Sequence, residues 1–158
     1  MVRGNRRTIV LVALALFSAV AIAPAASADV SGQQVRTQSG KVHCEVWANY
    51  WGMSGPEKKA TIPAGSIAMC APSILPDAFP GDPNWPGWAG LAVVDSAGNF
   101  SIQPIELPSQ AAKQVVMSYG QTYRFNGWSI AAGQDGTRFT NDRTGHGMFV
   151  NYETVYAF

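Results

Sequence analysis

The last forty residues constrain the fold most strongly, because turn-forming residues divide them into segments of strand length. Asn126-Gly127 is a strong signal for a two-residue hairpin turn, and turns rich in Gly and Asp are predicted at 133–136 and 142–145. We predict strands on either side of these turns: 121–125, 128–132, 137–141 and 146–151. The segment 152–158 closes the chain with alternating aromatic residues. This pattern predicts a run of antiparallel hairpins.

If the two later turns are tight and centred, these strands can be aligned residue by residue. Ile130 then lies opposite Phe139, and Phe139 lies opposite Met148, as an apolar row on one face of three strands. The adjacent row is mixed and holds Trp128, Asn141 and His146. A slip of one residue would turn these side chains to the other face of the sheet, so the register is a specific prediction.

Period-two alternation predicts another strand early in the chain. The two alternating sets are Val42, Cys44 and Val46, expected to face the core, and His43, Glu45 and Trp47, expected to face outward.

The middle of the chain is more varied. Residues 91–94 and 100–102 read as two strands joined by a turn, and 109–117 is the best candidate for a helix. Segment 71–90 contains five prolines, which cannot donate to a strand ladder, so we expect a long ordered loop there. We predict a mostly β protein: a small antiparallel β-barrel or sandwich with at most one short helix.

The first 28 residues have the three parts of a secretory signal peptide. Arginines precede an apolar segment at 9–22, and Ala26-Ser27-Ala28 is a typical cleavage site. The apolar segment is shorter than the ~20 residues that span a bilayer, and Pro24 interrupts it. We therefore expect residues 1–28 to be removed and residues 29–158 to form one secreted β-rich domain. The paired arginines leave open whether export uses the general or the twin-arginine route.

The chain has two cysteines, Cys44 and Cys70. An even pair in an exported protein normally forms a disulfide. No further cysteine or histidine stands at metal-ligand spacing, so we predict a Cys44–Cys70 disulfide, no metal site and no cofactor.

Charge limits the partners of the mature chain. Without the three arginines of the signal segment, eight Lys and Arg face ten Asp and Glu, a net charge near −2. Nucleic acids and anionic membranes are bound through clustered positive charge. We therefore expect neither as a partner after signal cleavage, and we expect a monomer.

Two groups of aromatic residues are candidates for ligand contact. Trp85 and Trp88 lie in the proline-rich segment "DPNWPGWAG", where two indoles on a stiff loop could stack on sugar rings. The alternative is that both rings pin the loop onto the domain. The second group, "WANYWG" at 47–52, lies close to Cys44 and is expected to extend the core beside the disulfide.

His146 stands between two glycines in "NDRTGHGMFV". In one interpretation it is a general base or ligand contact, oriented by Asp142 or Asp135. In the other it is structural, with Gly145 at a positive-φ turn position, Gly147 admitting a close neighbour, and the imidazole bonded to Asn141 or a backbone carbonyl. We favour the structural interpretation and assign no catalytic residue, because no nucleophile or metalloprotease motif is present.

Several stretches resemble a family of small secreted actinobacterial proteins of the mycobacterial type, mostly of unknown function. The family pattern is YGQ, GxxC, GxxCxN and GHG. The matching stretches here are 119–124, 127–130, 136–141 and 144–147, together with SGKVHC at 39–44. The resemblance implies secretion and a compact β-rich domain but no known reaction. Ile130 and Phe139 stand where such relatives have two cysteines, so burial of this apolar pair can replace a covalent link.

These observations predict a non-catalytic binding protein of the cell envelope or extracellular medium, with an envelope glycan or protein as partner. Trp85, Trp88 and His146 are its candidate ligand-binding residues. One alternative is a hydrolase that uses His146 with a carboxylate. The other is a secreted inhibitor of lysozyme-type enzymes, although segment 135–139 lacks the serine and tyrosine of their Ser-Gly-x-x-Tyr turn.

Overall fold

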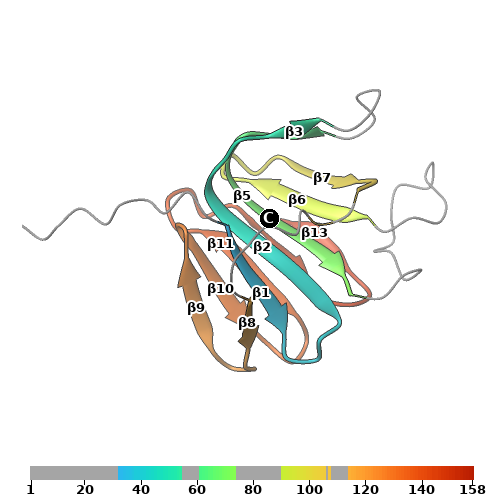
Figure 1. Cartoon of the computed structure of the whole chain (residues 1–158). Coiled ribbons are helices and arrows are strands. Elements are labelled where there is room, and N and C mark those ends of the chain that lie inside the picture. Colours follow the sequence, from blue (N-terminus) through green and yellow to red (C-terminus); the bar gives the residue numbers. More distant parts are fainter. Residues whose placement is uncertain (1–31, 55–60, 74–89, 106, 108–113) are drawn as a thin grey trace, which may run out of the picture.

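The structure, a computed structural model, describes residues 32–54, 61–73, 90–105, 107 and 114–158. Two β-sheets pack face to face in a sandwich, and no helix occurs in these residues (Figure 1). The mostly β prediction is confirmed. The predicted signal peptide and most of the proline-rich segment, including Trp85 and Trp88, lie outside the described residues.

The larger sheet has six strands in the order β7-β6-β5-β2-β1-β8. Its strands are β1 (Gln33–Thr37), β2 (Val42–Tyr50), β5 (Gly65–Pro72), β6 (Leu91–Asp95), β7 (Phe100–Gln103) and β8 (Gln114–Met117). All neighbours are antiparallel except β1 and β8, which pair in parallel. Residues 114–117 are therefore a strand, and the helix predicted at 109–117 is wrong for this part. The β-branched Val115 and Val116 suit a strand edge better than a helix.

The smaller sheet has five antiparallel strands in the order β13-β12-β11-β10-β9. They are β9 (Thr122–Phe125), β10 (Trp128–Ala132), β11 (Thr137–Asn141), β12 (Gly147–Val150) and β13 (Val155–Ala157). Asn126 and Gly127 both have positive φ, 54° and 80°, as a type I′ hairpin turn requires. Ile130 pairs with Phe139, and Phe139 pairs with Met148. The predicted register is confirmed.

The main core lies between the two sheets. All three residues of the predicted apolar row, Ile130, Phe139 and Met148, are fully buried there. They pack in one cluster with side chains of the six-stranded sheet, among them Val35 and Val46. Each fully buried side chain of this size stabilises the fold by roughly 1.5–3 kcal/mol before conformational entropy is subtracted.

The opposite face of the six-stranded sheet is also covered. A second apolar cluster there includes Trp47, Ile67, Met69 and Leu91. A short ribbon of β3 (Met53–Ser54) and β4 (Thr61–Ile62) continues β2 and β5 beyond the sheet (Figure 1), and Ile62 belongs to this cluster. Glu45 and Trp47, expected to face outward, are on this face but are buried at 0% and 3% exposure. Alternation placed them on the correct face, whereas the covering layer depends on tertiary packing.

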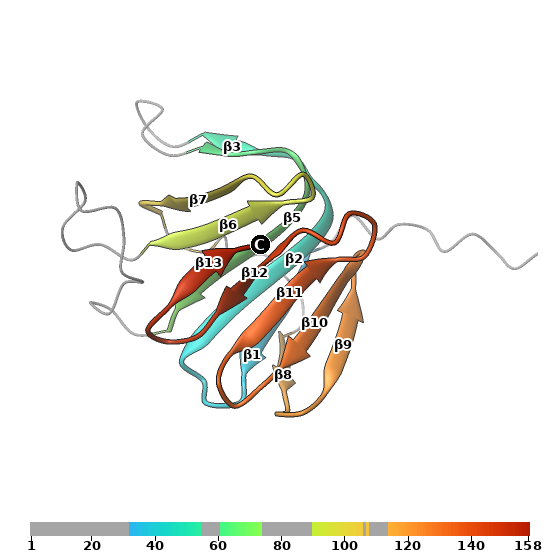
Figure 2. The same cartoon turned by 180° about the vertical axis from the view of Figure 1, so that it is seen from behind.

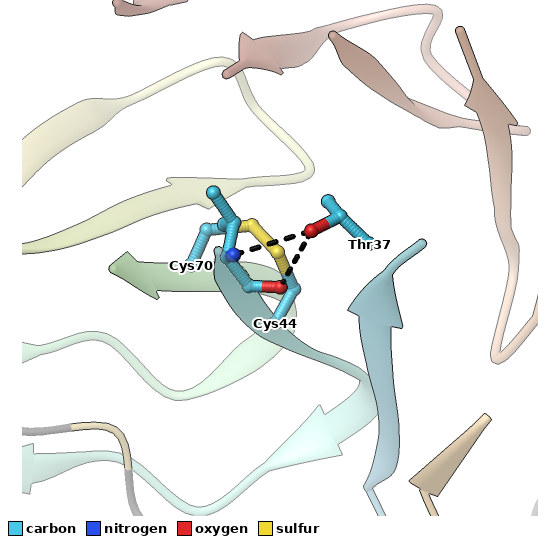
Figure 3. The surroundings of a disulfide bond; sticks show 4 residues. Thr37, Cys44 and Cys70 are labelled. Carbon is cyan, nitrogen blue, oxygen red and sulfur yellow. Dashed lines mark hydrogen bonds between the residues drawn. A yellow bond between two sulfur atoms is a disulfide. The ribbon is translucent and has the colours of Figure 1, made fainter. Parts of the chain in front are cut away.

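The predicted disulfide is present. Cys44 and Cys70 lie directly opposite each other on β2 and β5, with a Cα–Cα distance of 4.0 Å, and both are fully buried. The Thr37 hydroxyl lies next to them and bridges the main-chain N–H and C=O of Val42 at 3.2 and 3.4 Å (Figure 3). In the described residues, no helix is long and apolar enough to cross a membrane.

Candidate functional site

His146 lies at one end of the sandwich and is exposed. Its imidazole packs over Gly98 in the turn between β6 and β7: a Cβ atom at Gly98 would be 2.9 Å from Cγ and Nδ1 of the ring. Its row neighbours Trp128 and Asn141 both donate to Ser66 Oγ in the opposite sheet, at 3.1 and 3.2 Å. Trp128, Asn141 and His146 therefore share one face, as the register predicted, and this face is turned toward the six-stranded sheet.

The hydrogen bonds around His146 shape a turn. Asn141 Oδ1 accepts from the backbone N–H groups of Arg143 and Thr144 at 3.2 and 3.3 Å, and Gly145 has a φ of 77°. Among the described residues, the imidazole itself makes no hydrogen bond, so the expected bond to Asn141 or a carbonyl is not formed. The predicted positive φ at Gly145 is confirmed.

Asp142, the carboxylate considered as a partner for His146, is bound elsewhere. It accepts hydrogen bonds from the Ser129 hydroxyl and from Arg124, with an Arg124 Nη1–Asp142 Oδ1 distance of 3.2 Å. These three side chains occupy the outer surface of the five-stranded sheet. This geometry links Asp142 to Ser129 and Arg124 of its own sheet, and in the described residues no hydrogen bond joins it to His146.

The aromatic group at 47–51 forms a stack beside the second core cluster. The rings of Tyr50 and Trp51 are stacked with their centroids 4.8 Å apart, and Trp47 contacts both rings edge-on. Trp47 and Tyr50 are buried as expected, whereas Trp51 is 59% exposed. The group is thus a core extension with one exposed ring.

A buried polar cluster lies beside these rings. The Glu45 carboxylate accepts from Gln34 Nε2 at 2.7 Å and from Trp47 Nε1 at 3.1 Å. Burial, and then the charge of Glu45, raise the pKa of Tyr50, whose buried hydroxyl has no hydrogen-bond partner in the described part of the chain. Burial, and then the charge of Arg36, lower the pKa of His43. Because its carboxylate is enclosed and already bonded, we assign this cluster a structural role.

A group of partly exposed side chains lies on the outer face of the five-stranded sheet, which faces the viewer in Figure 2. Arg138, Phe149 and Tyr156 lie directly opposite one another on β11, β12 and β13. The rings of Phe149 and Tyr156 are stacked, with centroids 5.2 Å apart and planes 26° from parallel, and Tyr156 is 47% exposed. We call Arg138, Phe149, Tyr156 and Phe158 the aromatic platform.

Gly147, the second glycine of the GHG motif, makes room for this platform. A Cβ atom at Gly147 would be 2.8 Å from Cζ of Phe158 and would collide with the Phe139 carbonyl. The main chains of Gly147 and Phe158 exchange two hydrogen bonds, at 3.1 and 3.0 Å. The Arg138 guanidinium then stacks on the Phe158 ring, 3.4 Å from its centroid. The close neighbour predicted for Gly147 is therefore the ring of Phe158.

A hollow of about 400 Å³ lies along the platform, within the range of small-molecule binding sites. Its side chains combine the apolar rings of Phe149 and Tyr156 with hydrogen-bonding groups. These polar residues are Gln121, Thr122, Asp135 and Arg138. The hollow thus offers ring faces for stacking next to donors and acceptors, and this is the candidate ligand site.

Comparison with protein-family models, with curated proteins and with solved structures gave no match. Within the described residues, no group of three or more His, Cys, Asp or Glu side chains is arranged to hold a metal ion.

The platform was not among the residues singled out from the sequence. The signal was present, however, because the register that buries Phe139 and Met148 turns their chain neighbours Arg138 and Phe149 to the other face. The alternating aromatics of 152–158 extend the same pattern. Pairing each exposed aromatic with its cross-strand neighbour would have identified the platform.

Proposed function

We propose that this protein is a non-catalytic binding protein of the cell envelope or extracellular medium, and that it binds carbohydrate on the aromatic platform. The observation that carries the proposal is the stacked pair Phe149 and Tyr156, which borders a hollow that also holds the polar side chains of Gln121, Thr122, Asp135 and Arg138. The signal-like N-terminus and the buried Cys44–Cys70 disulfide support export. The sequence predicted an envelope glycan or protein as partner; of these the proposal takes the glycan, bound on the five-stranded sheet.

Sugar rings match this surface chemically. One face of a pyranose carries C–H groups that pack on an aromatic ring, while its hydroxyls both donate and accept hydrogen bonds. Elsewhere along its wall the hollow supplies the amide of Gln121, the hydroxyl of Thr122 and the carboxylate of Asp135. An aromatic ring face next to both hydrogen-bond donors and acceptors favours a neutral polyol as the ligand.

The charges of the hollow argue in the same direction. Arg138 is its one cation and Asp135 its one carboxylate among the lining residues. The Arg138 guanidinium is already stacked on Phe158. A polyanionic ligand would need clustered positive charge, which these residues do not supply.

Binding to envelope polysaccharides tests the proposal directly. We would mix the secreted protein with insoluble cell-wall glycans and measure its depletion from solution, then titrate soluble fragments by calorimetry. Tyr156→Ala and Phe149→Ala should each weaken binding about tenfold or more, because each removes one ring of the stack. Thermal unfolding of each variant would establish that the fold is retained.

Trp51→Ala is the control, because Trp51 is an exposed aromatic residue that directly follows β2, away from the platform. It should bind like the wild type. Absence of binding to every glycan fraction at millimolar concentration would overturn the proposal. Loss of binding in Trp51→Ala, with binding retained in Tyr156→Ala, would show that the ligand binds near Trp51 and not on the aromatic platform.

A further inference from the structure

A second hollow, of about 290 Å³, opens at one end of the sandwich. Turns from both sheets enclose it: the β1–β2 turn at 38–41, the β10–β11 turn at 133–136 and the β12–β13 turn at 151–154. Its wall is mainly polar. Its hydrogen-bonding side chains include Lys41, Tyr119, Asp135, Asn151, Tyr152 and Glu153. We call it the end hollow.

The end hollow and the platform hollow adjoin each other. Gly133, Asp135 and Gly136 line both of them. Two of the three are glycines, so no side chain from those positions separates the hollows. The ring of Phe149 lies directly on Gly136, where an added Cβ atom would collide with the ring. A platform ring thus extends to the boundary of the end hollow.

The boundary turn is held in place by Asn151. Its Nδ2 donates to the Asp135 carbonyl at 3.0 Å, and its Oδ1 accepts from the N–H groups of Glu153 and Thr154 at 2.9 and 2.7 Å. The β10–β11 and β12–β13 turns are therefore fixed to each other. The Asp135 side chain is exposed at this junction, where it can accept hydrogen bonds from groups on either side.

We infer that the end hollow is a second subsite of the same site, and that the ligand is a neutral oligosaccharide that crosses the 133–136 turn. This inference rests on the proposed function and adds the length of the ligand. The cross-strand row that contains the platform residues runs from Thr122 to Tyr156 over five strands. Its length is about 19 Å at ordinary strand spacing. One sugar ring covers only part of that row.

The end hollow offers a sugar the same chemistry as the platform. The ring of Tyr152 is covered on one face by Lys41, whose Nζ lies 4.7 Å from the ring centroid, and Tyr119 supplies a second ring. Across both hollows the two cations, Lys41 and Arg138, are matched by two carboxylates, Asp135 and Glu153. This balance favours an uncharged polyol over an acidic or basic chain.

Calorimetric titration with a length series of one bound glycan, from the disaccharide to the hexasaccharide, tests the inference. Affinity should rise about tenfold or more once the chain is long enough to enter both hollows, and then level off. Tyr152→Ala, which alters the end hollow alone, should remove this gain and leave disaccharide affinity unchanged. Lys41→Ala, at an exposed position, repeats the test if Tyr152→Ala folds poorly.

Asp135→Asn should weaken the long ligand about tenfold, since a carboxylate that accepts hydroxyl hydrogen bonds is replaced by an amide. Tyr156→Ala should weaken short and long ligands alike, and the exposed Val116→Ala on β8 should weaken neither. Equal affinity for all lengths, or a gain that survives Tyr152→Ala and Lys41→Ala, would overturn the inference while the proposed function stands. Binding of no glycan at any length would overturn both.

Discussion

The imidazole of His146 covers Gly98 at the point where the β11–β12 turn of one sheet meets the β6–β7 turn of the other. Gly98 has a φ of 87°, a left-handed conformation that side chains rarely adopt. The same glycine therefore makes the turn and leaves room for the ring. The contact joins the two sheets at one end of the sandwich, which gives the histidine of the GHG motif a structural role.

Gly98→Ala should lower the free energy of unfolding by about 1–3 kcal/mol, because it strains the backbone and forces the His146 ring away. Urea unfolding measures this loss. In a His146→Ala background the ring is gone, and only the backbone cost of about 1 kcal/mol should remain. A double-mutant cycle reports the difference, and additive effects of the two substitutions would contradict this account of the contact.

The C-terminal hairpins were predictable because local signals agree there. Asn126-Gly127 specifies its turn type, and Ile130, Phe139 and Met148 alternate with polar residues, so turn chemistry and burial require the same register. Alternation likewise predicted Cys44 on the core face, and the even cysteine count predicted its disulfide with Cys70. Where one face is buried and the turns are tight, sequence spacing determines which side chains meet.

Non-local pairing could not be predicted in this way. β8 joins the sheet through a parallel pairing with β1, about eighty residues earlier in the chain, and no local pattern encodes that partner. Glu45 and Trp47 are buried because a second layer covers their face. The candidate site also depends on non-local arrangement, since the end hollow joins the β1–β2 turn to turns of the other sheet. Local alternation indicates a face but not what covers it.

The disulfide should resist reduction in the native protein. Both Cys44 and Cys70 are 0% exposed, so a thiolate reaches them only after the sheet opens. Dithiothreitol alone should leave the bond intact, whereas dithiothreitol with urea should reduce it, as thiol labelling and mass spectrometry would report. Cys44→Ala with Cys70→Ala should lower the free energy of unfolding by about 3–4 kcal/mol. Rapid reduction without denaturant would contradict the observed burial.

Ile130→Cys with Phe139→Cys should form a new disulfide during oxidative folding. The two positions are directly opposed, as Cys44 and Cys70 are in the other sheet. The bond closes a short loop, worth about 2–3 kcal/mol, but losing the buried Phe139 side chain costs about 3–5 kcal/mol. The oxidised variant should therefore be less stable than the wild type and more stable than its reduced form. Mass spectrometry under non-reducing conditions, with Phe139→Cys alone as control, checks the bond.

The raised pKa of Tyr50 predicts a loss of stability at alkaline pH. In the folded state, burial and then the charge of Glu45 hold the phenol protonated above its ordinary pKa of about 10. Above pH 10 the unfolded chain therefore binds fewer protons at this residue, and the free energy of unfolding falls as pH rises.

Tyr50→Phe should remove the part of this decline that comes from the Tyr50 hydroxyl. It should cost little near neutral pH, because the hydroxyl it deletes is buried without a partner among the described residues. Urea unfolding across pH 8–11 measures both effects, with the exposed Tyr156→Phe as control. Parallel curves for the wild type and Tyr50→Phe above pH 10 would contradict the prediction.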